Sequence, residues 1–313
     1  GRTGQALELF DLSAAEAHAC RNAMTEIAAL ANAAQALTRL GRPDDALERL
    51  ARADALRAAH DKIEGRGDAN DWMASIALRE LGRLDEALAR AQVAIDVARA
   101  RSPGTLAGTI VTRADVWLDL GQLPRAREDR ELALRAATRP VERREVALLD
   151  LKLASEGRLR VEEALAAGRA MLAEDLQRFM ALVARLRLID LGPPEEAAAT
   201  ARNALVDARE AGFRGLEASA LSRLALAEMR AGESDAAATH ARPSAELAAG
   251  RGSEDLSWPA IVRNAVVVLR QAGLAGEARS VALRGEAWLD DVAARHVPPA
   301  FRESFLERHP VHR

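Results

Sequence analysis

The residues best suited to chemistry in this sequence are its paired carboxylates, its few histidines and its single cysteine. Asp44 and Asp45, and again Asp85 and Glu86, form adjacent acidic pairs of the kind that acid–base catalysis or cation binding uses. Both pairs follow a Leu-Gly-Arg phrase, so they fall in the first turn of an expected helix, where negative charge complements the helix N-terminus. We therefore interpret both pairs as helix-start residues.

The cysteine and the histidines form no recognisable catalytic or metal site. The histidine nearest to Cys20 is His18, which would lie on a different helix face, so we expect Cys20 to be a small buried residue. His309 and His312 have Pro310 between them, a pattern more typical of a frayed chain end than of a metal site. The sequence predicts no catalytic residue, no metal ligand and no cofactor-binding residue.

Motifs that hold nucleotides or activate nucleophiles are absent from the sequence. It contains no G-x-x-x-x-G-K-[ST] loop, no G-x-S-x-G turn and no H-E-x-x-H pair. The arginines within 139–144 could hold a phosphate, but the acidic residues among them favour a solvated helix face. These features favour a protein that is not an enzyme and that uses no cofactor.

Composition points to a helical protein without a large charged surface. Hydrophobic residues make up 49% of the 313 residues but aromatic residues only 3%, so the apolar content is mostly Ala, Leu and Val. Ala and Leu favour helices. The net charge of −3 provides no field to hold nucleic acid or an anionic membrane, and no apolar stretch reaches the ~20 residues of a membrane helix. We expect an all-α cytoplasmic protein that binds neither nucleic acid nor membranes.

A repeat organises the whole chain. Leu40–Leu47 has the sequence Leu-Gly-Arg-Pro-Asp-Asp-Ala-Leu, and Leu81–Leu88 has the sequence Leu-Gly-Arg-Leu-Asp-Glu-Ala-Leu. Further copies centre on Gly1, Gly121, Gly157, Gly192, Gly232 and Gly273, so that successive glycines are 40, 41, 39, 36, 35, 40 and 41 residues apart. Each unit predicts a helix of roughly 15 residues, a turn at the glycine and a second helix of similar length.

Small residues recur at fixed places in the second helix of each unit. Five residues after the glycine come Ala6, Ala46, Ala87, Ala126, Ala197, Ala237 and Ala278. Twelve residues after it come Ser13, Ala53, Ala94, Ala133, Ala204, Ser244 and Gly285. The two columns share one helix face, so they let a neighbouring helix approach closely. Only the Gly157 copy departs from the pattern, with its alanine displaced to Ala164.

This pattern around a junction glycine resembles the tetratricopeptide repeat over essentially the whole chain. It departs from that family in its longer period and in its lack of most large aromatic residues. The resemblance implies a right-handed superhelical solenoid of antiparallel helix pairs, about seven to eight repeats, in residues 1–297. Residues 298–313 would form a capping helix or tail, with an apolar stripe of Phe301, Phe305 and Leu306.

In tetratricopeptide proteins the first helices of the pairs line a concave groove, and counting back from each glycine gives the residues expected there. These candidate ligand contacts are Asn32, Gln35, Trp72, Arg79, Asp115, Ser222, Arg263, Asn264 and Arg270. By resemblance, Asn32 and Asn264 would bond the backbone of an extended peptide. An inward-facing Trp72 would offer a rigid apolar platform. Each polar candidate could instead be an ordinary solvated residue, and Trp72 could pack beneath the linker at 61–69.

Three functions fit this sequence. The chain could be a scaffold or regulatory arm that binds a protein, a peptide or a neighbouring module of the same polypeptide. It could be a sensor for a small molecule, or a guard or subunit domain of an enzyme whose active site lies elsewhere. Longer repeats of this kind resemble the C-terminal arms of large bacterial signalling proteins of the AAA or STAND type. The absence of catalytic motifs and the repeated groove favour the first function, and the junction position of Gly1 leads us to expect that the natural polypeptide extends upstream.

Overall fold

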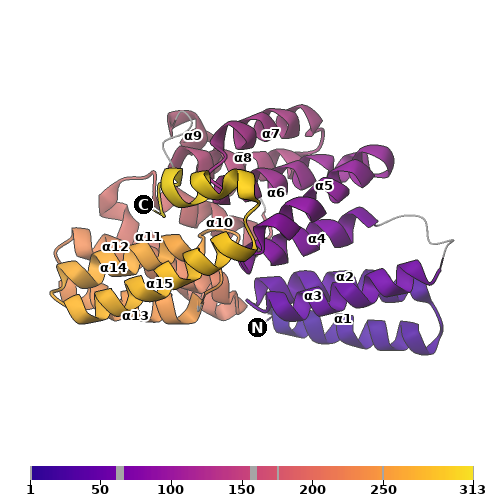
Figure 1. Cartoon of the computed structure of the whole chain (residues 1–313), viewed down its shortest axis with the longest axis horizontal. Helices are drawn as coiled ribbons and strands as arrows, with labels where there is room; N and C mark the ends of the chain where they lie inside the picture. Colours follow the sequence, from indigo (N-terminus) through magenta and orange to yellow (C-terminus); the bar gives the residue numbers. More distant parts are fainter. Residues whose placement is uncertain (1, 61–66, 156–160, 175, 249, 313) are drawn as a thin grey trace.

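The computed structural model describes residues 2–60, 67–155, 161–174, 176–248 and 250–312, which form helices and turns without a strand (Figure 1). The α-helices are α1 (Arg2–Ala19), α2 (Ala23–Arg39), α3 (Pro43–Ala58), α4 (Gly67–Glu80), α5 (Leu84–Arg101), α6 (Leu106–Asp119), α7 (Leu123–Ala136), α8 (Pro140–Ser155), α9 (Val161–Leu172), α10 (Arg178–Ile189), α11 (Pro194–Ala211), α12 (Arg214–Arg230), α13 (Ser234–Ala248), α14 (Trp258–Gln271) and α15 (Ala275–Arg295). Shorter turns are η1 (Pro103–Thr105), η2 (Pro299–Phe301) and η3 (Ser304–Arg308). None of the described helices has both the length and the apolar character needed to cross a membrane. The predicted all-α class is confirmed.

Helices α2 to α15 follow one another as antiparallel pairs, and α1 packs against α2 (Figure 1). Each pair turns at a junction glycine as predicted, although the junction of α8 and α9, with Gly157, lies outside the described residues. Gly41, Gly82 and Gly121 have φ angles of 73°, 75° and 70°. This left-handed conformation ends a helix and suits glycine, which has no Cβ to clash. The pairs stack into the superhelical solenoid that the repeat predicts.

The two columns of small residues lie at the helix contacts. In the first column Ala46, Ala87, Ala126, Ala197, Ala237 and Ala278 are at most 4% exposed. In the second column Ala53, Ala94, Ala133, Ala204 and Ser244 are 0% exposed. At Gly285 an added Cβ would lie 2.6 Å from Cγ1 of Val262, so α14 and α15 touch through this glycine. Larger side chains in these columns would hold the helices apart.

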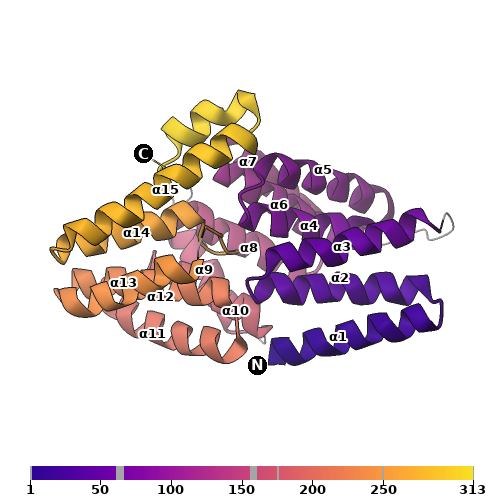
Figure 2. The ribbon, with the colours of Figure 1, turned by 60° about the horizontal axis from the view of Figure 1, so that its bottom comes forward.

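The solenoid closes, because its later repeats return to the turns of its early repeats (Figure 2). Beside the junction of α2 and α3, Arg251 forms an ion pair of 2.7 Å with Asp44. At the junction of α4 and α5, the amide of Asp85 donates to the carbonyl of His296 at 2.9 Å. At the junction of α6 and α7, the hydroxyl of Ser304 donates to a backbone carbonyl of the turn at 2.9 Å. Successive junctions thus form a docking edge for the C-terminal part of the chain.

The junction glycines therefore have a second role that the repeat pattern did not reveal. An added Cβ at Gly82 would lie 2.6 Å from the ring of Trp288. An added Cβ at Gly121 would lie 2.5 Å from the carbonyl oxygen of Ser304. Any side chain at either glycine would push the C-terminal part away. These glycines end a helix and also allow close approach of a distant segment.

The segment after Val297 contacts an early helix pair as well as α15. Phe305 is 1% exposed and belongs to a core cluster with Trp117 of α6. The ring of Phe301 meets Trp117 edge-on, with the ring centres 5.4 Å apart. Leu306, the third residue of the expected stripe, is 37% exposed. The tail joins the last repeat to an earlier one, a contact that the sequence did not predict.

One expectation about burial is wrong. Cys20 is exposed in the turn between α1 and α2. The next residue, Arg21, has a φ of 54°, so the chain turns away from α1 at this point. A residue in such a turn has no neighbouring helix to cover it, whatever its hydrophobicity. Within α1 itself, the side chains of Leu9 and Leu12 are also exposed, at 66% and 56%.

We predict that Ala87→Leu destabilises the fold by about 1–3 kcal/mol, because the added carbons must enter a close-packed helix contact. Ala87 is 0% exposed, and its carbonyl accepts a hydrogen bond of 2.8 Å from Ser75. Val93→Leu on the same helix is the matched control, since Val93 is 46% exposed. Urea unfolding measures both variants, and equal midpoints would show that the column does not mark a close contact.

Candidate functional site

The interior of the closed solenoid is the candidate site, and residues 250–257 between α13 and α14 organise it. The amide of Gly252 donates to the carbonyl of Glu80 at 2.8 Å, which places the segment beside the end of α4. The hydroxyls of Ser219 and Ser253 share a hydrogen bond of 3.0 Å, which places it beside α12. Residues 250–257 are therefore part of the protein interior and not a surface loop.

Asp255 is the buried anchor of this segment. Its side chain is 0% exposed, and its carboxylate lies 2.5 Å from Nη1 of Arg223 and 3.6 Å from Nε of Arg187. Arg223 also pairs with Asp190 at 2.7 Å. Burial would lower the pKa of Arg223, but the two carboxylates raise it above its ordinary value. The guanidinium group of Arg223 therefore remains charged in the interior, and Asp255 is the carboxylate that contacts both Arg223 and Arg187.

A second buried cluster connects α4, α6 and α8. Nε of Arg79 donates to Asp119 at 2.8 Å, and Nζ of Lys152 donates to Asp115 at 3.0 Å. Arg79 also donates to the carbonyl of Ser253 at 3.3 Å, which ties residues 250–257 to the early repeats. Burial would raise the pKa of Asp115, but Lys152 and Arg79 lower it to about 2. This carboxylate stays ionised because cations surround it.

Other carboxyl groups of the interior have the opposite electrostatic environment. Burial raises the pKa of Glu145 to about 7, and the charges of Glu142 and Glu254 act in the same direction. Burial also raises the pKa values of Glu80 and Glu254. An added Cβ at Gly108 would lie 2.5 Å from Oε2 of Glu145, so this carboxyl group lies directly against α6. Part of the interior therefore changes its charge near neutral pH.

A cavity of about 260 Å³ opens beside the Asp255 cluster. Helices α6, α8, α10, α12 and α14 contribute to its wall, and the C-terminal tail closes one side. The positively charged side chains in its lining are those of Lys152, Arg187, Arg223, Arg230 and Arg263. The negatively charged ones are those of Asp119, Asp190 and Asp255. A cavity of this size is suited to a small ligand or to the end of a longer one.

Several predicted groove residues do lie in this interior. Arg79 and Asp115 belong to the second buried cluster, with 3.4 Å between their nearest nitrogen and oxygen atoms. Arg263 and Asn264 line the cavity. The amide nitrogen of Asn264 donates to the hydroxyl of Ser222 at 3.0 Å, so α14 and α12 are bonded to each other at this point. Their role as ligand contacts stays a prediction.

The other predicted groove residues lie away from the cavity. Nε1 of Trp72 donates to the hydroxyl of Thr112 at 2.7 Å, and the Trp72 side chain is half-buried. Asn32 and Arg270 are exposed, and Gln35 is half-buried. The linker residues 61–66, beneath which Trp72 could pack, lie outside the described residues.

The repeat pattern did not reveal the residues at the centre of the site. Lys152, Arg187 and Arg223 each interrupt an apolar run in the first helix of a pair. Such an interruption signals a buried ion, because charged residues are rarely buried unless they are paired. Asp255 had no comparable signal, since it lies in a stretch rich in glycine and charge. Only the fold shows that these residues meet.

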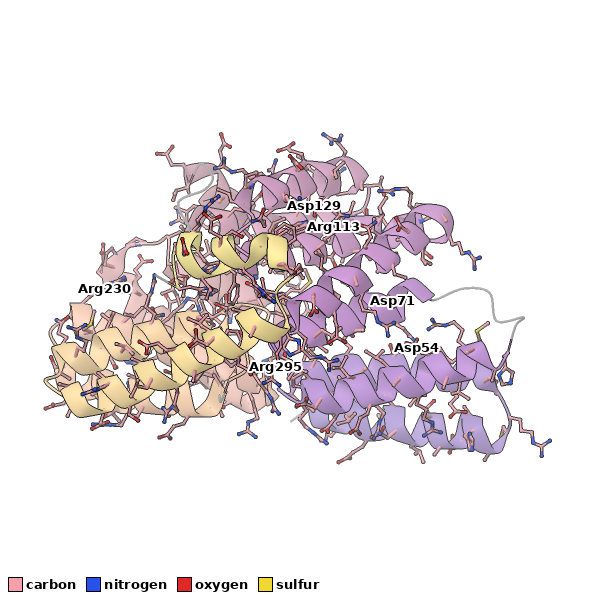
Figure 3. All side chains as sticks on the ribbon, viewed as in Figure 1. Asp54, Asp71, Arg113, Asp129, Arg230 and Arg295 are labelled. Carbon is pink, nitrogen blue, oxygen red and sulfur yellow. The ribbon has the colours of Figure 1, made fainter. Side chains whose placement is uncertain are left out.

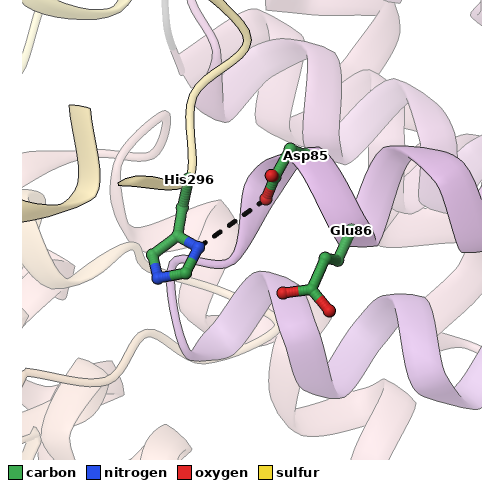
Figure 4. A group of neighbouring side chains, drawn as sticks. All are labelled: Asp85, Glu86 and His296. Atoms are coloured by element: carbon green, nitrogen blue, oxygen red, sulfur yellow. Dashed lines mark ion pairs between the residues drawn. The ribbon is translucent and has the colours of Figure 1, made fainter. Parts of the chain in front are cut away.

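A group of possible metal ligands lies where α15 ends beside α5 (Figure 4). Asp85, Glu86 and His296 place one ligand atom each within 4.8 Å of the others, and Nδ1 of His296 lies 3.7 Å from Asp85. Glu86 accepts two hydrogen bonds of 2.7 Å from Arg83, which lower its pKa. The acidic pair lies in the first turn of α5, as predicted. We interpret the group as a joint between α5 and the end of α15.

Ion pairs outside the interior connect neighbouring helices (Figure 3). Arg113 on α6 and Asp129 on α7 point toward each other, with a nitrogen–oxygen distance of 2.6 Å. Asp54 on α3 and Asp71 on α4 both pair with Arg90, at 3.3 and 2.6 Å. These ion pairs join helices that lie close together in the chain. They do not connect the late repeats to the early ones.

The C-terminal histidines form part of the packed wall, so the expectation of a frayed end is wrong for them. His309 is 5% exposed, and its ring stacks on that of His312 with 3.9 Å between the ring centres. Nδ1 of His312 lies 2.6 Å from the carbonyl oxygen of Phe305. Burial lowers the pKa of His312 to about 4, so its ring is neutral at physiological pH.

Comparison with known proteins shows a likeness of fold. No protein-family model matches the sequence, and no curated protein matches it. A Rap protein solved in complex with competence and sporulation factor is 14% identical, with a TM-score of 0.57 over 99% of this chain and 94% of that one. A STAND protein of Pyrococcus horikoshii with a tetratricopeptide repeat sensor is 13% identical, with a TM-score of 0.50 over 98% of this chain. This chain spans 52% of the STAND protein. The fold is that of tetratricopeptide-type helical repeats.

We predict that Asp255→Asn destabilises the protein by about 3–5 kcal/mol, because removing one partner of a buried ion pair leaves the other charge uncompensated. Asp291→Asn is the matched control, since Asp291 pairs with Arg295 on the surface and is 47% exposed. Denaturant unfolding with circular dichroism measures both variants. Equal stability of Asp255→Asn and the wild type would contradict the anchoring role of Asp255.

We predict that Glu145→Gln stabilises the protein at about pH 8, by on the order of 1–3 kcal/mol, and has little effect at about pH 5. The folded-state pKa of Glu145, about 7, exceeds the ordinary value of 4.5. The ionised carboxylate therefore opposes folding above that pKa, and its cost disappears as the pH falls toward the unfolded pKa. Unfolding of both proteins across this range measures the difference, which would stay constant with pH if Glu145 were solvated.

Proposed function

We propose that this tetratricopeptide-type repeat protein is a regulatory binding arm of a larger bacterial signalling protein. It holds a protein or peptide ligand inside its closed solenoid and transmits the occupancy of that site to a neighbouring module. The cytoplasmic location expected from the sequence belongs to the same proposal. The observation that carries it is the cavity of about 260 Å³ where side chains of several repeats converge.

The construction of the cavity supports a link between ligand and shape. The wall of the cavity includes Asp255, which belongs to residues 250–257, and His309, which belongs to the C-terminal tail. These two segments hold the late repeats against the early ones, through contacts such as the 2.8 Å hydrogen bond from Gly252 to Glu80. A ligand that touches this wall changes the free energy of the closed form relative to more open forms. Such a difference is what a regulatory arm requires.

The two solved structures support a binding role by analogy of fold. One is a Rap protein in complex with competence and sporulation factor, and the other contains a tetratricopeptide repeat sensor. A sensor for a small molecule is the second candidate function, favoured by the limited volume of the cavity. The two candidates differ in whether the cavity holds the end of a peptide or an entire ligand.

The test is a thermal-unfolding screen with pools of short synthetic peptides and, separately, a set of small metabolites. A ligand present at 100 times its Kd and bound only to the folded state stabilises that state by ~2.7 kcal/mol, which raises the melting temperature. We expect a peptide pool to give this shift. A shift with metabolites alone would favour the sensor, and no shift with either set would overturn the proposal.

A variant that fills the cavity tests whether the ligand binds there. Leu226 lines the cavity, so Leu226→Trp is expected to remove the ligand-induced shift. Val267→Trp is the matched control, since Val267 is 43% exposed on α14 and does not line the cavity. Retention of the full shift in a folded Leu226→Trp protein would place the ligand elsewhere on the molecule.

A further inference from the structure

A second cavity, of about 150 Å³, lies at the seam where the late repeats meet the early ones, and we call it the seam cavity. From the early repeats, Gly41 of the α2–α3 junction and Glu80, the last residue of α4, line it. From the late repeats, Ala218 on α12, Leu247 on α13 and Ile261 on α14 line it. None of the described residues in this wall also lines the cavity of about 260 Å³, so the two cavities have separate walls.

The two halves of the solenoid touch beside the seam cavity. An added Cβ at Gly41 would lie 3.1 Å from Cβ of Arg214, the first residue of α12. The amide of Gly252, which also lines the seam cavity, donates to the carbonyl of Glu80 at 2.8 Å. A molecule in this cavity would therefore contact both halves. Its binding would stabilise the closed solenoid relative to forms in which the halves separate.

Glu80 is the buried charged residue of this wall. It is 6% exposed, yet within the described part of the chain its carboxyl group has no hydrogen-bond or ion-pair partner. Two cations influence it, but both are bound elsewhere, since Arg79 donates to Asp119 at 2.8 Å and Arg251 donates to Asp44 at 2.7 Å. A buried carboxylate without such a partner is costly, and burial raises the pKa of Glu80.

The remainder of the wall determines what kind of molecule could supply that partner. Leu247 and Ile261 provide apolar surface, and a cavity of roughly 150 Å³ accommodates a molecule the size of benzene. The other charged residues of the wall, Arg214 and Glu246, are exposed and opposite in sign. An ammonium group would satisfy Glu80 best, because hydrogen bonds between ionised partners are about twice as strong as neutral ones. A short hydrocarbon chain would then occupy the apolar part of the cavity.

We infer that the seam cavity binds a small alkylammonium ligand, whose ammonium group donates to Glu80 while its alkyl chain contacts Leu247 and Ile261. This site goes beyond the proposed function, since it is separate from the cavity of about 260 Å³. Because both halves of the chain form it, the ligand is an effector that favours the closed form.

The experiment is an isothermal titration of the full chain at constant ionic strength with two probes, butylammonium chloride and butanol. The probes have the same chain length, and only the first carries a charge. We expect butylammonium to bind at least about 10-fold more tightly, because its contact with Glu80 is charge-assisted. Equal binding of the two probes, or no binding of either, would overturn the inference.

Variants assign the contact to Glu80. Glu80→Gln removes a charge that has no partner, so the variant is expected to fold, and circular dichroism verifies this. It should weaken butylammonium binding by about 10-fold and leave butanol binding unchanged. Glu233→Gln is the matched control, because Glu233 is exposed and does not line the seam cavity. Binding of butylammonium to a folded Glu80→Gln protein with the wild-type affinity would overturn the inference.

Two further variants distinguish the seam cavity from the larger one. Leu247→Phe reduces the volume of the seam cavity and should weaken the binding of both probes. Leu226→Trp fills the larger cavity and should leave butylammonium binding unchanged. Loss of butylammonium binding in Leu226→Trp alone would place the probe in the larger cavity. That result would overturn the inference and leave the proposed function standing.

Discussion

Two arginines buried in the middle of the protein require a counter-charge, and Asp255 supplies it. A guanidinium group removed from water is costly unless a carboxylate and further hydrogen bonds surround it. Arg187 obtains these bonds from the carbonyls of Leu148 and Glu254, at 2.5 and 2.7 Å, and Arg223 from Asp190 and Asp255. Residues 250–257 must therefore remain in the interior, and through them the late repeats stay in contact with α4.

Closure of the solenoid depends on backbone as much as on charge. The turns at Gly41, Gly82 and Gly121 each receive a segment from beyond residue 200, and the last two leave no room for a Cβ. Side chains there would separate the halves and expose the Asp255 cluster to water. The alanine columns act at a shorter range, since they set the distance between neighbouring helices. Small residues thus determine both the stacking of repeats and the meeting of the two ends.

The same interior stabilises some charges and opposes others. Asp115 has cations close by and keeps a pKa of about 2, whereas Glu145 has a pKa of about 7 because burial and nearby carboxylates act together. Groups like Glu145 reduce stability near neutral pH, and natural proteins tolerate such costs most readily at functional sites.

The sequence by itself determined the repeat, its junctions, the helix pairs and the faces on which Ala87 and Ala94 pack. These features depend on residues close together in the chain, where spacing alone decides which side chains share a helix face. It also placed Arg79, Asp115 and Asn264 on the inner helices. Only the tertiary structure decided that the solenoid closes, that Asp255 lies between Arg187 and Arg223, and that the tail reaches Trp117. The partner of a buried charge lies tens to hundreds of residues away, and the local pattern of one chain holds no record of which distant segments meet.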